Sequence, residues 1–174
     1  MAAVVVLFTA AAALTASLGI AGDAAPNLAA GGPSALLAPS TDAGAADALL
    51  PPGYRNPRSA EQAVQWALGQ VGIHRDAGHC LRFVNLAYGR ASGPPSAFLV
   101  WTRSNAALHH FTYPAPRGAI VVWSNAIGGG HGHVGISLGN GRMVSTTGGP
   151  IAILQTRGFA DSAYFGWMPP YFYM

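Results

Sequence analysis

The feature that most constrains the fold is a change of hydrophobic pattern near two prolines, Pro114 and Pro116. Before them apolar residues recur at helical spacing, and after them they form short β-rich runs. The strands expected there cover residues 119–123, 133–138, 143–146, 151–154 and 164–167. The segment Gly139-Asn140-Gly141 is a strong hairpin signal between the second and third of them. Helices followed by an antiparallel sheet predict an α+β domain, with the N-terminal helices packed on the sheet.

Three helices are expected in the first half of the domain. Ser59-Ala60-Glu61-Gln62 has the pattern of a capping box, which opens a helix. The expected helices run from that box to about Leu68, from near Cys80 to Gly89, and from Pro94-Pro95-Ser96 through Leu108.

The N-terminal part of the chain divides into two segments before this domain. Residues 1–22 are an uncharged apolar run followed by small residues, which predicts a signal peptide or a membrane anchor. Residues 23–54 are rich in Ala, Gly and Pro and read as a flexible linker. Residues 55–174 are then one compact domain. The expected location is outside the cytoplasm, either secreted or in the cell wall or periplasm.

Composition sets a bacterial context and excludes one class of partner. All nine basic residues are arginine, and alanine and glycine are abundant, which is typical of a GC-rich bacterial genome. The net charge is +3, and the arginines are scattered along the chain. Nucleic-acid binding normally needs a basic patch, so we expect no nucleic-acid partner.

Cys80 is the only cysteine, so it cannot form an internal disulfide. At the start of a helix the unpaired N–H groups and the helix dipole favour a thiolate, which is the reactive form. His133 lies 53 residues downstream and could act as the base for such a nucleophile. The alternative is that Cys80 is a small buried apolar residue.

These motifs together resemble the NlpC-type papain-like cell-wall cysteine peptidases, with the CHAP amidases as close relatives. The resemblance is carried by Cys80 at a helix start and by residues 116–123 and 132–143, within a match over about 58–167. It implies a papain-like fold. It also implies that the cysteine attacks an amide of peptidoglycan, that the histidine is its base, and that a third polar residue orients the imidazole.

Carried over to this chain, the resemblance makes Cys80 the nucleophile and His133 the general base. The third position lies twelve residues after the histidine, which is Ser145 here. A three-residue turn at 139–141 would put Ser145 on the face of His133, whereas a two-residue turn would put Thr146 there. Either hydroxyl could accept a hydrogen bond from the imidazole, without the charge of a carboxylate.

The segment before Cys80 departs from the NlpC-type pattern, because Gly78-His79-Cys80 is nearer to the CHAP pattern. The backbone N–H of Cys80 is one candidate donor for an oxyanion hole. His74 or His79 is the candidate for the second donor, with an ordinary exposed loop histidine as the alternative.

We expect neither a metal nor another cofactor. His131 and His133 alternate on one strand, and with His109-His110 they make a zinc site conceivable. However, the sequence has no His-Glu-x-x-His motif and no third ligand at a recognisable spacing.

The expected function is that of a secreted peptidoglycan hydrolase, a cysteine peptidase or amidase that cleaves an amide bond of the stem peptide. The expected partners are peptidoglycan stem peptides and, through the N-terminal segment, transiently a membrane; the chain is expected to be a monomer. One alternative is a catalytically weakened domain that binds the wall or regulates a partner. Another is a secreted antibacterial toxin of the same fold.

Overall fold

The computed structural model describes residues 44–173 of the chain. The predicted signal peptide or anchor at 1–22, and the linker up to residue 43, lie outside the described residues. No helix within 44–173 combines the length and the apolar character needed to cross a membrane.

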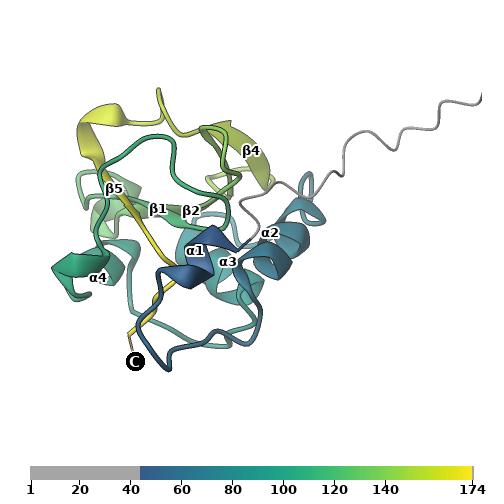
Figure 1. The fold of residues 1–174 in the computed structure, drawn as a ribbon. Coiled ribbons are helices and arrows are strands. Elements are labelled where there is room, and N and C mark those ends of the chain that lie inside the picture. The colour runs from purple at the N-terminus through teal and green to yellow at the C-terminus, as the bar shows by residue number, and fades with distance from the viewer. Residues whose placement is uncertain (1–43, 174) are drawn as a thin grey trace, which may run out of the picture. The chain divides into compact units, whose positions relative to one another are not determined.

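Short helices precede a five-stranded antiparallel sheet whose strand order is β4-β3-β2-β1-β5 (Figure 1). The helices are α1 (Ala45–Ala48), α2 (Ala60–Leu68), α3 (Cys80–Ala87) and α4 (Ala97–Thr102). The strands are β1 (Ile120–Trp123), β2 (His133–Ser137), β3 (Arg142–Ser145), β4 (Ala152–Gln155) and β5 (Tyr164–Met168). Single 3-10 turns cover Ala106–Leu108, Gly128–Gly130 and Asp161–Ala163. The prediction of an α+β domain with N-terminal helices on an antiparallel sheet is confirmed.

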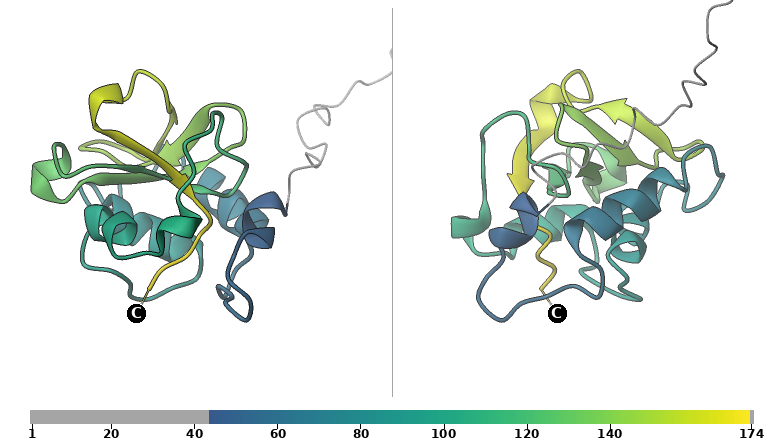
Figure 2. Two further views of the ribbon diagram at one scale, coloured as in Figure 1. Left: turned by 60° about the vertical axis from the view of Figure 1, so that its left-hand side comes forward. Right: turned by 45° about the vertical axis from the view of Figure 1, so that its right-hand side comes forward.

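Both faces of the central strands are buried, which explains why β1 is apolar at every position. Ile120 and Val122 join the core between the sheet and helices α2, α3 and α4. Val121 and Trp123 point to the other face, where they pack in a second cluster with Ala46 of α1. Figure 2 shows α2, α3 and α4 on one side of the sheet. A strand that is buried on both faces has a continuous run of apolar residues, because apolar and polar residues alternate only where one face is exposed to solvent.

Helix α2 begins as its capping box predicts. Gln62 N–H donates to Ser59 Oγ at 3.3 Å, and Ser59 N–H donates to the Gln62 side chain at 2.9 Å. Its first N–H, that of Ala60, donates to Asp47 Oδ2 at 2.7 Å. Asp47 lies in α1, within the segment expected to be linker, so residues 44–54 contribute to the domain. The cause is a tertiary contact, which local composition does not report.

The third helix is shorter than predicted. Ser96 caps it as expected, with Leu99 N–H donating to Ser96 Oγ at 3.2 Å, but α4 ends at Thr102 and does not run through Leu108. Ser104 Oγ donates to Trp101 C=O at 2.8 Å and Ala107 N–H donates to Asn105 Oδ1 at 2.9 Å. These side-chain bonds satisfy backbone groups locally and replace the helical ladder.

The turn between β2 and β3 is the three-residue turn. Ser137 pairs with Met143, and Leu138 N–H donates to Arg142 C=O at 2.8 Å, which leaves Gly139-Asn140-Gly141 as the loop. Both of its glycines have positive φ, at 87° and 76°. This register places Ser145 on the face of β3 that matches His133.

We expect the Asp47→Ala substitution to lower the free energy of unfolding by about 1 kcal/mol, because it leaves the Ala60 N–H without its acceptor. Asp47→Asn retains an oxygen at that position and should cost clearly less. Urea unfolding of the three proteins measures both values. Equal stability of Asp47→Ala and wild type would contradict the role of α1 as part of the domain.

Candidate active site

Cys80 is the first residue of α3, and the loop before it is held by backbone hydrogen bonds. His79 N–H donates to Asp76 C=O at 2.8 Å, and Gly78 N–H donates to Thr147 C=O at 2.6 Å. His79 occupies the N-cap position without a side-chain cap. The first N–H groups of a helix have no partner within the helix, so the N–H groups beside the thiol remain available.

Asp76 holds this loop, and the sequence analysis did not identify it. Its carboxylate is 3% exposed and pairs with Arg75 at 2.9 Å and with Arg82 at 3.1 Å. Its φ is +52°, an unusual value for a residue other than glycine. The strain is offset because both oxygens of the carboxylate are bound, one of them by Arg82 in the first turn of α3.

His133 is the first residue of β2, and its contact with Ser145 determines its tautomer. The two side chains meet with 3.0 Å between Ser145 Oγ and His133 Nε2. Ser145 Oγ also donates its hydrogen to Val134 C=O at 2.7 Å. Since the hydroxyl has only one hydrogen, it accepts from Nε2–H of His133, and the lone pair of the neutral ring lies on Nδ1.

Aromatic rings hold the imidazole on its other sides. The ring centroid of Phe159 lies 4.8 Å from that of His133, and the centroid of Trp123 lies 5.6 Å from it. Gly132, just before the histidine, leaves no room for a side chain, because a Cβ there would lie 2.7 Å from Trp123 C=O. The ring therefore has one defined orientation.

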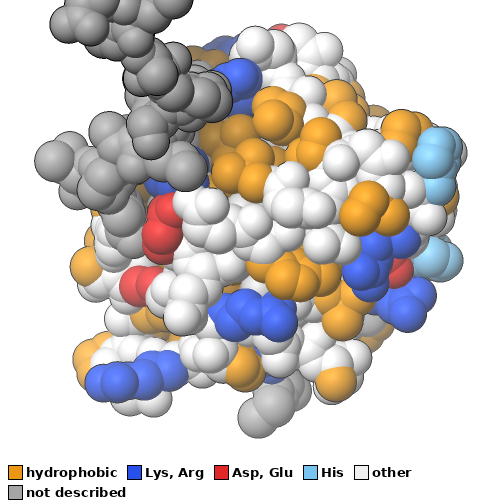
Figure 3. Space-filling model, turned by 90° about the vertical axis from the view of Figure 1, so that its right-hand side faces the viewer, with side chains coloured by type: hydrophobic (Ala, Val, Ile, Leu, Met, Phe, Trp, Pro, Cys, Tyr) orange, Lys and Arg blue, Asp and Glu red, His pale blue; other side chains and the backbone are white. Residues whose placement is uncertain are grey.

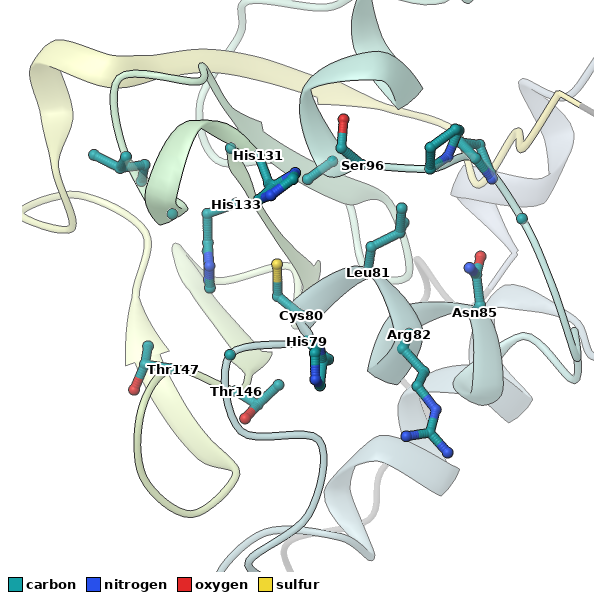
Figure 4. Close-up of a pocket in the computed structure, with 18 of the residues that line it drawn as sticks. His79, Cys80, Leu81, Arg82, Asn85, Ser96, His131, His133, Thr146 and Thr147 are labelled. Atoms are coloured by element: carbon teal, nitrogen blue, oxygen red, sulfur yellow. The ribbon is translucent and has the colours of Figure 1, made fainter.

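Cys80 and His133 both line a cleft of about 950 Å³. His79, His131, Thr146 and Phe159 contribute to its walls. Figure 4 shows the Cys80 sulfur and the His133 ring pointing into it. Within the described residues no hydrogen bond joins the thiol and the imidazole, and in many enzymes the catalytic hydrogen bonds tighten only when substrate binds.

The other candidate residues separate into two groups. His79 lines the cleft, as does Thr146, whose Oγ1 donates to Asp76 C=O at 3.3 Å. His74 is exposed and does not line the cleft. Of the two histidines expected as oxyanion donors, only His79 therefore lies at the cleft.

Burial decides the ionisation of the resting pair. It raises the pKa of the Cys80 thiol, and backbone hydrogen bonds at Val134, Leu81 and Cys80 itself lower that pKa in part. Burial lowers the pKa of His133 to about 4. The N–H groups at the helix start lower the pKa of the thiol, as expected, but desolvation of the charge outweighs them and the net pKa is raised. At neutral pH the pair is a thiol and a neutral imidazole.

No group of three or more His, Cys, Asp or Glu side chains within residues 44–173 could hold a metal ion. On the face drawn in Figure 3 the basic side chains lie in separate groups and form no continuous stripe.

Comparison with known proteins finds similarity in structure and none in sequence. No protein-family model and no curated protein matches the chain. The P60 domain of an antigen from M. avium subspecies paratuberculosis is similar, with 16% identity and a TM-score of 0.48, over 63% of this chain and 92% of that one. The peptidoglycan hydrolase RipB from M. tuberculosis is similar, with 21% identity and a TM-score of 0.46, over 65% of this chain and 62% of RipB.

The buried His133 should make the fold sensitive to acid. Its pKa is about 4 when folded and near 6.5 when unfolded, so the unfolded chain binds the extra proton between these values. The stability contribution is complete above about pH 6.5 and is lost as the pH falls toward 4. Between pH 7 and pH 5 we expect wild type to lose on the order of 2 kcal/mol more than His133→Gln, measured by urea unfolding. Parallel losses in the two proteins would contradict it.

The raised thiol pKa has a separate consequence. Because Cys80 is the only cysteine, its alkylation by iodoacetamide can be followed by mass spectrometry of the intact chain. We expect the rate to keep rising with pH beyond about 8.5, the ordinary thiol pKa, since only the thiolate reacts. The urea-unfolded chain supplies the reference curve. A rate plateau below pH 7 in the folded protein would instead indicate a preformed thiolate and imidazolium pair.

Proposed function

We propose that this protein is an exported peptidoglycan hydrolase that cleaves an amide bond of the stem peptide by Cys–His nucleophilic catalysis. One observation carries the proposal: Cys80 and His133 line one cleft, and Ser145 holds the imidazole in the tautomer that leaves Nδ1 free to accept a proton. The choice of peptidoglycan follows from the resemblance of the motifs to the NlpC-type peptidases.

The neutral resting pair requires the proton to move as the nucleophile attacks. Nδ1 of His133 takes the thiol proton while the sulfur forms a bond to the carbonyl carbon of the substrate amide. The Ser145 hydroxyl accepts the Nε2–H throughout and so stabilises the imidazolium that results. The negative charge moves to the substrate oxygen, where the N–H of Cys80 and the His79 side chain are the candidate donors.

Collapse of this intermediate completes the first half of the reaction. The imidazolium returns its proton to the leaving nitrogen, the carbon–nitrogen bond breaks, and a thioester to Cys80 remains. Water then attacks the thioester with His133 as base, and the thiol is restored as the acid product leaves. The balance is one water consumed for one amide cleaved.

A second function is favoured by one feature of the same site. Ser145 is a neutral orienting group, and burial disfavours both charged forms of the catalytic pair. A domain with weakened catalysis that binds wall peptides would fit those features. The trapping of an acyl-enzyme at Cys80 would exclude this alternative.

The proposal is tested by digestion of purified peptidoglycan with the full chain and its variants, with mass spectrometry of the released fragments. We expect Cys80→Ala and His133→Ala to lose on the order of 10³-fold in rate or more, and Ser145→Ala on the order of tenfold. The control is Ser137→Ala, which removes another buried serine hydroxyl; that hydroxyl donates to Ala115 C=O at 2.9 Å, accepts from Gly139 N–H at 3.1 Å and does not line the cleft. It should retain the wild-type rate.

Full activity of Cys80→Ala would overturn the nucleophilic mechanism. Equal losses in Ser145→Ala and Ser137→Ala would show that the Ser145 effect is general destabilisation and not orientation of His133.

A further inference from the structure

Asn85 carries a buried oxygen that nothing in the described protein uses. The residue lies in α3 and is only 6% exposed, and its Oδ1 is buried without a hydrogen-bond partner within residues 44–173. Buried polar atoms are nearly always hydrogen-bonded, so an unpaired carboxamide oxygen requires a reason. Asn85 also lines the cleft that contains Cys80.

The segment over Asn85 keeps space for this carboxamide. A Cβ at Gly93 would lie 2.6 Å from Asn85 Nδ2 and 2.7 Å from Oδ1. Gly93 is not among the glycines with positive φ, so its backbone conformation is open to any residue. Glycine at position 93 is therefore explained by the space that the Asn85 carboxamide needs, and not by the backbone conformation at that position.

The position of Asn85 relative to the thiol defines which part of a substrate it meets. Five residues along a helix correspond to ~7.5 Å of axial rise, and an extended peptide advances ~3.3 Å per residue. Figure 4 shows Asn85 on the other side of Cys80 from His133, with Leu81 between them along the wall. A peptide bound at Cys80 and extended along α3 would reach Asn85 about two residues from the attacked bond.

We propose that Asn85 is a specificity-determining residue whose carboxamide hydrogen-bonds an amide group of the substrate peptide, about two residues from the scissile bond. This rests on the proposed hydrolysis of peptide amides. A carboxamide has both a donor and an acceptor, which match the C=O and N–H of an amide. Rotation about its terminal bond, which is a soft torsion in asparagine, turns the oxygen toward the cleft.

The test uses two variants that perturb the carboxamide in different ways. Asn85→Leu keeps a similar size and removes the polar atoms, whereas Gly93→Ala keeps the asparagine and displaces its carboxamide. Asn125→Leu is the control, since it makes the same change at an exposed asparagine that does not line the cleft. The substrate is the mixture of soluble muropeptides that a muramidase releases from purified peptidoglycan.

We expect both variants to raise KM on the order of tenfold with kcat nearly unchanged, because a remote hydrogen bond is lost. Asn125→Leu should match wild type. The urea midpoint of Asn85→Leu should equal or exceed that of wild type, since it removes an unpaired buried oxygen. Active Asn85→Leu with a wild-type KM would overturn the inference, as would a loss of activity that parallels a loss of stability.

A binding measurement separates this inference from the proposed function. Titration of Cys80→Ala with the same muropeptides should shift the side-chain amide NMR signal of Asn85, which is assigned by its absence in Asn85→Leu. If the Asn85 signal shifts but wild type does not cleave the muropeptides, the proposed hydrolysis is rejected and Asn85 remains a peptide-binding residue. Cleavage with the same KM in Asn85→Leu and wild type would reject the role of Asn85 and support the proposed hydrolase function. The absence of both binding and cleavage would reject both.

Discussion

The hydrogen bond between Ser145 and His133 is the interaction on which the rest of the site depends. It exists only in one register of β2 and β3, since a slip of one residue would turn Ser145 to the opposite face. Gly135 makes the close approach possible, because a Cβ there would lie 2.6 Å from Met143 Sδ and 3.3 Å from Ser145 Cβ. The turn glycines Gly139 and Gly141 fix the register of β2 and β3, and the register brings Ser145 to His133. Through this contact they determine which nitrogen of His133 carries its hydrogen.

The same burial that orders the imidazole also sets the electrostatics of the pair. Burial disfavours the thiolate and the imidazolium alike, and the backbone N–H groups near the sulfur oppose this effect only in part. The charge separation that the proposed chemistry needs then arises with the substrate in place. Its carbonyl oxygen takes the negative charge from sulfur, and the Ser145 hydroxyl supports the positive one.

Local sequence predicted the elements whose cause is local. The capping box of α2, the start of α3 at Cys80 and the hairpin at 139–141 each depend on residues within a few positions of one another. The contribution of Asp47, the two ion pairs of Asp76 and the unpaired oxygen of Asn85 each depend on residues brought together by folding. No periodicity or motif reports such contacts. Helix α4 ends at Thr102 and not at Leu108 as predicted, because polar side chains after Thr102 form hydrogen bonds with nearby backbone groups.

The proposed nucleophile, Cys80, and the proposed base, His133, are held by one set of contacts, although one begins a helix and the other a strand. The loop before Cys80 is joined to the residues that directly follow Ser145, through Gly78 N–H to Thr147 C=O and Thr146 Oγ1 to Asp76 C=O. Arg82 then ties the carboxylate of Asp76 to the first turn of α3. Because Ser145 orients the imidazole and its neighbours hold the cysteine loop, a movement of this end of β3 displaces both reactive groups together. A neutral serine is therefore enough for the orienting role proposed for Ser145, because backbone contacts on both sides of it hold the geometry and the hydroxyl has only to select the tautomer of His133.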